Sequence, residues 1–209
     1  MAVGTAGNRM PRSARRRQLL AAAQDVFVAN GYHAAAMDDI ATRAGVSKPV
    51  LYQHFPSKLE LYLALLDTHA EELVRRLQTA INTTTDNKER VHNAISTYFD
   101  FVDGDEPGHK GAFRLVFETD LRNEPAVRER VERTGRRCME SVADTIAADT
   151  GLPRAEAELL SVALTGISEM AARYWLSTDR SIPKEEAVRL LEALAWRGIS
   201  TFPLQDETD

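Results

Sequence analysis

Apolar residues recur three and four positions apart along most of this 209-residue chain, which is the spacing of amphipathic helices. Glycine and proline interrupt the pattern, for example at Gly31, Pro56 and Gly151. The pattern predicts long helices over about residues 13–31, 57–82, 88–102, 125–150, 154–177 and 184–200, a short one over 111–121, and two more short ones between 37 and 55. We therefore expect an all-α fold of about nine helices.

Residues 37–55 have the pattern of two short helices joined by a glycine turn. Ile40, Ala41 and Ala44 give the first helix an apolar face, and Gly45 provides the left-handed backbone that such a turn requires. Ser47 is expected to cap the second helix with its hydroxyl. A short helix, a glycine turn and a second helix form a helix-turn-helix, which lays its second helix in the major groove of DNA.

The second short helix divides into an inward and an outward face. Leu51 and Phe55 are four residues apart and point toward a core. The outward positions carry groups suited to base edges and phosphates, namely Lys48, Val50, Tyr52, Gln53 and His54. Two short core helices in any all-α protein would show the same spacing, so this outward set favours the DNA-binding interpretation.

The charge of the chain is divided unevenly. Its net charge is −5, yet residues 1–60 carry eight Lys or Arg against four Asp or Glu, a balance of +4 that leaves −9 for the remainder. A basic end on an acidic body is expected where only one end meets phosphate. Residues 1–11 are expected to form a mobile basic arm. Arg12, Arg15 and Arg16 follow it and are predicted to contact DNA, the alternative being a solvated basic tail.

The N-terminal quarter resembles the TetR (tetracycline-repressor) family of bacterial transcriptional regulators. The resemblance rests on residues 22–32, Ile40-Ala41, Ala44-Gly45-Val46-Ser47, Leu51-Tyr52, His54-Phe55 and Ser57-Lys58. Where the family often has a capping Thr, this chain has Ala36 and Met37, and Asp38 is expected to cap instead. The resemblance implies a helix-turn-helix domain over 12–58, a helical ligand-binding and dimerisation domain over 59–204, and a tail over 205–209.

The predicted DNA contacts combine the outward positions with the family motif. Lys48, Pro49, Val50 and Tyr52 are assigned to base edges. Ser47, His54 and Lys58 are assigned to phosphates, the last with help from a helix N-terminus. Together with Arg12 and Arg16 they form the predicted interface with a palindromic operator in double-stranded DNA.

The last two predicted helices are apolar on more than one face, so each must be covered on more than one face. By resemblance they pair with a second copy in a four-helix bundle, and the resulting homodimer would bring two recognition helices to successive half-sites. The candidate dimer residues are Leu160, Leu164, Ile167, Leu191, Leu194 and Trp196. The alternative is a self-contained core.

By the same resemblance, the middle helices enclose a pocket for a small-molecule ligand that releases a repressor from its operator. The candidate lining residues are Phe99, Phe113, Phe117, Met139, Val142, Met170, Arg173 and Tyr174. The alternative for each is an ordinary core position. Arg114 and Glu118 are four residues apart and favour an intrahelical ion pair over a ligand contact.

No pattern for catalysis, metal binding or membrane insertion occurs. The sequence has no glycine-rich phosphate loop, no nucleophile elbow, no paired metal-binding histidines and no apolar run long enough to span a bilayer. The single cysteine, Cys138, has Arg133, Arg136 and Arg137 nearby, which would lower its pKa, although an inert cysteine is the favoured interpretation. We expect a cytoplasmic regulator without cofactor, the alternative being a helical small-molecule-binding protein that does not recognise DNA sequence.

Overall fold

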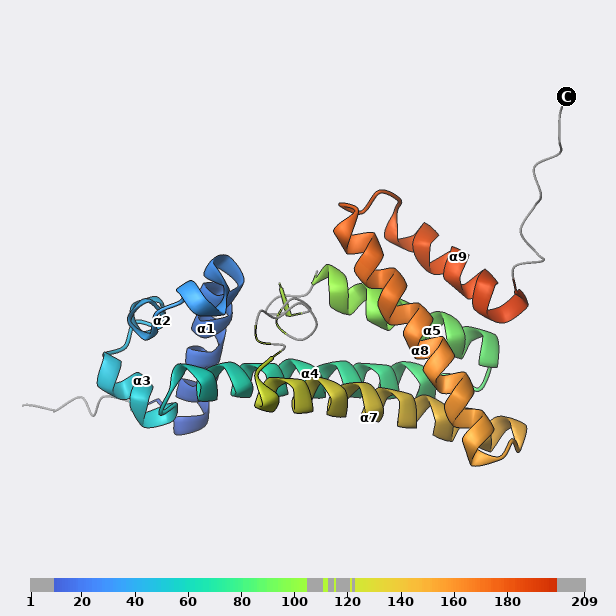
Figure 1. Ribbon diagram of the computed structural model, residues 1–209, viewed down its shortest axis with the longest axis horizontal. Helices are drawn as coiled ribbons and strands as arrows, with labels where there is room; N and C mark the ends of the chain where they lie inside the picture. Colours follow the sequence, from blue (N-terminus) through green and yellow to red (C-terminus); the bar gives the residue numbers. More distant parts are fainter. Residues whose placement is uncertain (1–9, 105–110, 113–114, 116–120, 122, 199–209) are drawn as a thin grey trace, which may run out of the picture.

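A computed structural model describes residues 10–104, 111–112, 115, 121 and 123–198. Within these residues the protein is all-α (Figure 1). The helices are α1 (Arg12–Ala34), α2 (Met37–Arg43), α3 (Lys48–His54), α4 (Lys58–Asn82), α5 (Asn87–Asp103), α7 (Pro125–Thr150), α8 (Arg154–Ser177) and α9 (Lys184–Arg197). The short helix predicted over 111–121 falls mostly outside the described residues, as do most of the predicted arm and all of the tail.

The first three helices and the start of α4 form a small head around one apolar core. Leu19, Phe27, Ile40, Leu51 and Phe55 are each at most 3% exposed in that core. The first helix was predicted to end at Gly31. The regular helix is interrupted there, with Gly31 at φ +73° and ψ 168°, and one further helical turn beyond this kink extends α1 to Ala34.

Helix α4 runs from the head along the full length of the body (Figure 1). Ser57 caps it: the Ser57 hydroxyl accepts a hydrogen bond of 3.1 Å from the backbone N–H of Glu60. Leu61, Leu65, Leu73 and Leu77 lie at helical spacing on its buried face. One continuous helix therefore belongs to both parts of the molecule.

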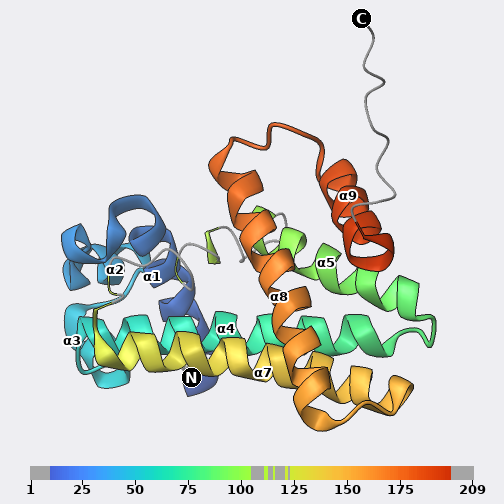
Figure 2. The same cartoon turned by 45° about the vertical axis from the view of Figure 1, so that its right-hand side comes forward.

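The body is a bundle in which α7 lies beside α4, α5 packs on the other side of α4, α8 crosses both α5 and α7, and α9 packs on α5 (Figures 1 and 2). Helix α7 has the predicted bounds, because Pro125 opens it and Gly151 closes it with φ +69°. Phe99 of α5 packs against Trp175 of α8, with ring centroids 5.4 Å apart.

The head also contacts the body away from the junction with α4. The Tyr62 hydroxyl on α4 donates a hydrogen bond of 3.0 Å to the carbonyl of Leu115. A Cβ added at Gly111 would lie only 2.6 Å from a methyl group of Val28 on α1. The described part of residues 111–115 is therefore in close contact with both α1 and α4.

Candidate nucleic-acid interface and ligand cavity

Helix α3 presents the outward face that its sequence predicts. Leu51 is fully buried beneath the helix, whereas Lys48, Pro49 and Tyr52 are exposed. Tyr52 is 40% exposed although it is a large aromatic residue. Val50 is half-buried at the edge of this face. The four residues assigned to base contacts thus share a surface that could enter a major groove.

Two capping predictions are wrong. The Ser47 backbone occupies the N-cap position of α3, but its side chain makes no capping hydrogen bond. Helix α2 begins after Ala36 without a side-chain cap, so Asp38 does not replace the family's Thr. The Ser47 side chain is exposed. Asp38 lies within the first turn of α2 and pairs with a lysine instead of capping the helix.

That partner is the recognition-helix lysine. The Lys48 ammonium lies 2.7 Å from the Asp38 carboxylate, and both side chains are more than half exposed. The hydrogen bond and the negative charge of Asp38 raise the pKa of Lys48 above its ordinary value. The ion pair links α2 to α3 on the predicted DNA face.

The start of α1 places basic residues beside the end of α3. The Arg16 guanidinium lies 4.5 Å from the centre of the Phe55 ring. Burial, and then the charges of Arg12, Arg16 and Arg15, lower the pKa of His54. A neutral His54 among arginines can still donate a hydrogen bond to phosphate, while the arginines provide the positive charge.

Lys58 is held inside the head. Its ammonium donates hydrogen bonds to the carbonyls of Tyr32, His33 and Ala35, at 2.9, 3.2 and 2.9 Å, and lies 4.5 Å from the centre of the Tyr32 ring. An ammonium group has three donors, and all three are used here. This arrangement favours a structural role at the end of α1 over the phosphate contact predicted for Lys58.

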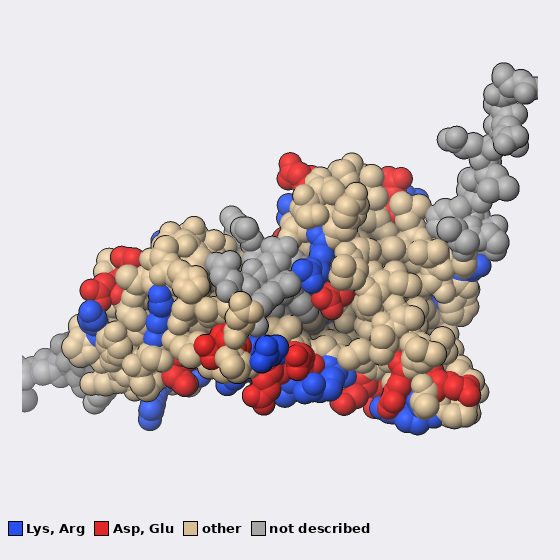
Figure 3. Space-filling view, viewed as in Figure 1, with Lys and Arg blue, Asp and Glu red and all other residues tan. Residues whose placement is uncertain are grey.

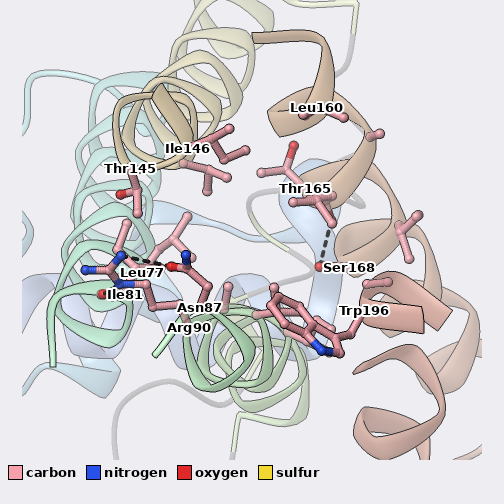
Figure 4. A pocket seen from close by; sticks show the side chains of 18 of the residues that line it. Leu77, Ile81, Asn87, Arg90, Thr145, Ile146, Leu160, Thr165, Ser168 and Trp196 are labelled. Carbon is pink, nitrogen blue, oxygen red and sulfur yellow. Dashed lines mark hydrogen bonds between the residues drawn. The ribbon is translucent and has the colours of Figure 1, made fainter. Parts of the chain in front are cut away.

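A largely apolar cavity of about 430 Å³ lies in the body among α4, α5, α7, α8 and α9 (Figure 4). Such a volume is typical of sites for small molecules. Its apolar lining comes mainly from Leu77, Ile81, Val91, Ile95, Val142, Ile146, Leu160, Leu164, Ile167 and Trp196. Thr165 and Ser168 also line it, but each hydroxyl donates to a backbone carbonyl of its own helix. The cavity is suited to a hydrocarbon group.

The polar groups of the cavity gather around Arg90 at the start of α5. Its guanidinium donates to the carbonyls of Ile81 and Thr84, at 3.1 and 2.9 Å, and to the side chains of Asn87 and Asp149. Asn87 and Arg90 lie next to each other at one side of the cavity in Figure 4. A guanidinium at the edge of an apolar cavity could contact the polar end of an amphipathic ligand.

The predicted ligand residues do not coincide with this cavity, except for Val142. Met170 and Tyr174 are 62% and 70% exposed and lie on the surface. Phe99 and Met139 pack elsewhere in the body, and Arg173 pairs with Glu169 at 3.6 Å. Phe113 and Phe117 lie outside the described residues, with Arg114 and Glu118. Arg90 was missed because its partner Asp149 is 59 residues away in the sequence.

The predicted dimer residues divide between the cavity and the surface. Leu160, Leu164, Ile167 and Trp196 line the cavity. Leu160 and Trp196 are also 45% and 47% exposed at the surface. Leu191 and Leu194 are half-buried on α9. Leu160 and Trp196 thus line the cavity and are also among the exposed apolar side chains.

Cys138 is not activated by its arginine neighbours. Its side chain is 2% exposed, and burial raises the pKa of the thiol to about 11 even though a hydrogen bond with Tyr98 and the charge of Arg137 lower it. The favoured interpretation of an inert cysteine agrees with this environment. Across the described residues no group of His, Cys, Asp and Glu could hold a metal ion. No helix among them is long and apolar enough to cross a membrane.

Comparison with known protein families identifies the class. A profile described as bacterial regulatory proteins of the TetR family matches residues 19–65, which include the whole helix-turn-helix. A second profile, described as a tetracycline-repressor-like C-terminal domain, matches residues 87–198. The chain belongs to the TetR family of DNA-binding transcriptional regulators and is not an enzyme.

Individual relatives are similar over nearly the full chain. The chain is 50% identical to the HTH-type transcriptional activator FasR of Mycolicibacterium smegmatis, over 95% of this chain and 89% of that protein. A TetR-like regulator from Rhodococcus sp. RHA1 is 30% identical with a TM-score of 0.71, covering 93% of this chain and 100% of that one. FadR from Bacillus subtilis in complex with stearoyl-CoA shares the fold, with a TM-score of 0.71 at 21% identity, over 88% of this chain and 98% of that one.

Proposed function

We propose that the protein is a homodimeric regulator that binds a palindromic operator and is released from it by a ligand with a long hydrocarbon chain. The observation that carries the DNA-binding part is the exposed face of α3, with Lys48, Pro49 and Tyr52 outward and Leu51 buried. Arg12, Arg15 and Arg16 stand close enough to the end of α3 to lower the pKa of His54. Base-reading and phosphate-binding groups therefore lie close together.

The proposed ligand class rests on the cavity. Its lining is largely apolar, its volume is about 430 Å³, and its charged side chains, among the described residues, are Arg90 and the Asp149 carboxylate that pairs with it. This composition suits a long acyl chain joined to a polar head group. The complex of the structurally similar B. subtilis FadR with stearoyl-CoA supports an acyl thioester as the first compound to test.

For the direction of regulation we propose activation in place of the repression expected from the family resemblance. The support is the name of the M. smegmatis relative, a transcriptional activator, at 50% identity over 95% of this chain. A reporter promoter carrying the operator distinguishes the two. Expression of the protein raises transcription if it activates, and lowers transcription if it represses.

The experiment that tests operator binding is selection of duplexes from a random DNA pool at near-physiological salt. We expect an enriched inverted repeat. Lys48→Ala should cost about 1–3 kcal/mol on that repeat and relax one base position, whereas substitution of the exposed Lys88 on the body should change neither. Weak salt-sensitive binding without enrichment would contradict the proposal and favour a small-molecule-binding protein that does not recognise sequence.

Stearoyl-CoA is then titrated into the protein–operator complex. We expect it to lower operator affinity, with free coenzyme A as the control without a hydrocarbon chain. A protein that binds the operator but ignores stearoyl-CoA would refute only the ligand class.

A further inference from the structure

One side chain of α1 reaches across the head to the turn between α2 and α3. The Gln18 amide donates a hydrogen bond of 2.8 Å from Nε2 to the backbone carbonyl of Ala44, which is 26 residues away in the sequence. Ala44 directly follows α2 and is 5% exposed. Carbonyls at the end of a helix have no partner within that helix. Gln18 therefore satisfies a carbonyl at the point where the helix-turn-helix changes direction.

The other end of the same amide holds an arginine. The Oε1 atom of Gln18 accepts a hydrogen bond of 2.8 Å from Nη1 of Arg15, which lies one turn earlier in α1. Both hydrogen bonds are partly buried. The reverse orientation of the amide would place its NH₂ group against the guanidinium and its oxygen against the carbonyl, so only the orientation described satisfies both partners. One neutral side chain thus joins Arg15 to the turn of the helix-turn-helix.

Arg15 belongs to the basic start of α1. This helix begins at the lower edge of the head in Figure 1, and Lys or Arg side chains project from the same edge in Figure 3. Burial, and then the charges of Arg15 and two neighbouring arginines, lower the pKa of His54, so Arg15 lies near the end of α3. Among the described residues, only Gln18 accepts a hydrogen bond from the Arg15 side chain. The remaining N–H groups of its guanidinium are therefore available to a phosphate.

We propose that Gln18 is a positioning residue for DNA recognition. It fixes Arg15 to the turn of the helix-turn-helix, so that a phosphate contact from α1 and the base contacts from α3 form together. The proposal rests on the DNA contacts of the proposed function and adds that the two kinds of contact are linked. Ordering a long side chain during binding weakens association. Because Gln18 already orders Arg15 in the free protein, this loss is avoided when DNA binds.

The link affects operator binding more than binding to unrelated DNA. Gln18 carries no charge, so it adds nothing to the electrostatic attraction that dominates non-specific complexes. In such complexes α3 makes no set of base contacts with which the Arg15 contact has to be in register. Loss of Gln18 therefore reduces the preference for the operator, whereas loss of Arg15 weakens binding to every duplex.

The test is a double-mutant cycle on the full-length protein. Binding is measured to the selected inverted repeat and to a scrambled duplex at several salt concentrations. Gln18→Met removes both hydrogen bonds of the amide and keeps a side chain of similar length. Arg15→Ala removes its partner, and a third protein carries both changes. Asn30→Ala, at an exposed amide near the other end of α1, is the matched control. Denaturant titration verifies that each variant is folded under the binding conditions.

We expect Gln18→Met to bind the operator about three- to tenfold more weakly, with little change on the scrambled duplex and an unchanged salt slope. Arg15→Ala should weaken binding to both duplexes and reduce the salt slope by about 1. In the Arg15→Ala protein, the further change Gln18→Met should have almost no effect on operator affinity, because Gln18 acts through Arg15. Asn30→Ala should bind both duplexes as the wild type does.

A purely structural role of Gln18 gives different results. Losses of operator affinity that add in the double variant, or that are equal on both duplexes, would overturn the proposal, since Gln18 would then act on the fold and not through Arg15. Unchanged operator affinity in Gln18→Met would overturn it as well, while leaving the proposed DNA contacts intact. A wild type that binds both duplexes equally would refute sequence recognition itself, and this link with it.

Discussion

At the scale of single residues, the two lysines of the helix-turn-helix have different environments. Lys58 donates all three of its ammonium hydrogens to carbonyls at the end of α1. Lys48 is more than half exposed and pairs with one exposed carboxylate. Hydrogen bonds to three carbonyls, two of them part-buried, stabilise the fold, whereas an exposed ion pair contributes little and leaves the cation available to DNA. The two residues should therefore respond differently to substitution.

Lys58→Met removes three hydrogen bonds from α4, two to the last turn of α1 and one to Ala35, which follows it. We expect the free energy of unfolding to fall by about 1.5–3 kcal/mol. Operator affinity should fall with it, but the dependence of that affinity on salt should stay the same, because no phosphate contact is lost. Denaturant titration and salt-series binding measure the two effects. A decrease of about 1 in the salt slope would show instead that Lys58 contacts phosphate.

The buried thiol of Cys138 provides a pH prediction. Its pKa is raised to about 11, above the 9.0 of an unperturbed thiol. The protonated thiol therefore stabilises the folded state below pH 9, and this contribution is lost as pH rises toward 11. A shift of this size corresponds to about 2–3 kcal/mol. Between pH 8 and 10.5 the wild type should lose more stability in urea than Cys138→Ala does. Equal losses would contradict the assignment. A thiol reagent should also label Cys138 slowly unless the protein is unfolded.

At the scale of elements, α2 and α3 are joined by the turn at Gly45 and by the ion pair between Asp38 and Lys48. The carboxylate of Asp38 lies on the surface that would face DNA. It neutralises part of the positive charge of the recognition helix in the free protein. DNA must compete with Asp38 for Lys48, and a base edge that binds the lysine well competes better than a phosphate met at random.

Asp38→Ala should therefore reduce sequence discrimination. We expect binding to unrelated duplexes to tighten by an amount near the value of an exposed ion pair, about 0.2–1 kcal/mol, while operator binding changes less. The ratio of the two affinities, measured at one salt concentration, reports the effect. Asp39→Ala removes a neighbouring exposed carboxylate and is the matched control. If both variants tighten binding equally, general repulsion explains the result and Asp38 has no special role.

The elements differ in how far the sequence could predict them. Helical periodicity with Pro125 and Gly151 was sufficient to give the bounds of α7, and Leu51 with Phe55 was sufficient to orient α3. The Ser47 cap failed because the orientation of one hydroxyl depends on its rotamer and not on residue type. The sequence did not predict which α8 residues line the cavity, because a helix that is apolar on two faces does not reveal which face is inward. The exposed Met170 was therefore assigned to a pocket. For Cys138, arginines nearby in sequence suggested an electropositive site, but burial dominates its pKa.

At the scale of the whole molecule, the head and the cavity are separate sites on one chain. Residues 1–60, which include the helix-turn-helix, carry a net charge of +4, and the remainder carries −9. The positive end favours encounter with DNA from one direction, and the acidic body is repelled by it. A ligand in the body can therefore act on DNA binding only by changing the conformation or pairing of the chain.

Reciprocity between the two sites is a prediction for the intact dimer. If stearoyl-CoA weakens operator affinity by some factor, saturating operator must weaken stearoyl-CoA affinity by the same factor. Couplings of this kind typically correspond to about 5–150-fold. Calorimetric titration of ligand into the protein, with and without an operator duplex, measures this factor. A scrambled duplex is the control, and unequal factors would indicate that a second ligand or a change of assembly is involved.

Helix α4 begins after its cap at Ser57, and Lys58 in its first turn donates a hydrogen bond to the end of α1. The other end of α4 contributes Leu77 and Ile81 to the cavity lining. Its 25 residues make a rod of about 37 Å. If such a rod pivots by about 5° near the cavity, simple geometry moves its far end by about 3 Å. Successive bases along a DNA strand are about 3.4 Å apart. A small rotation of α4 near the cavity leaves the packing around a ligand nearly unchanged. At the other end of α4 the same rotation shifts the recognition helix by nearly one base pair.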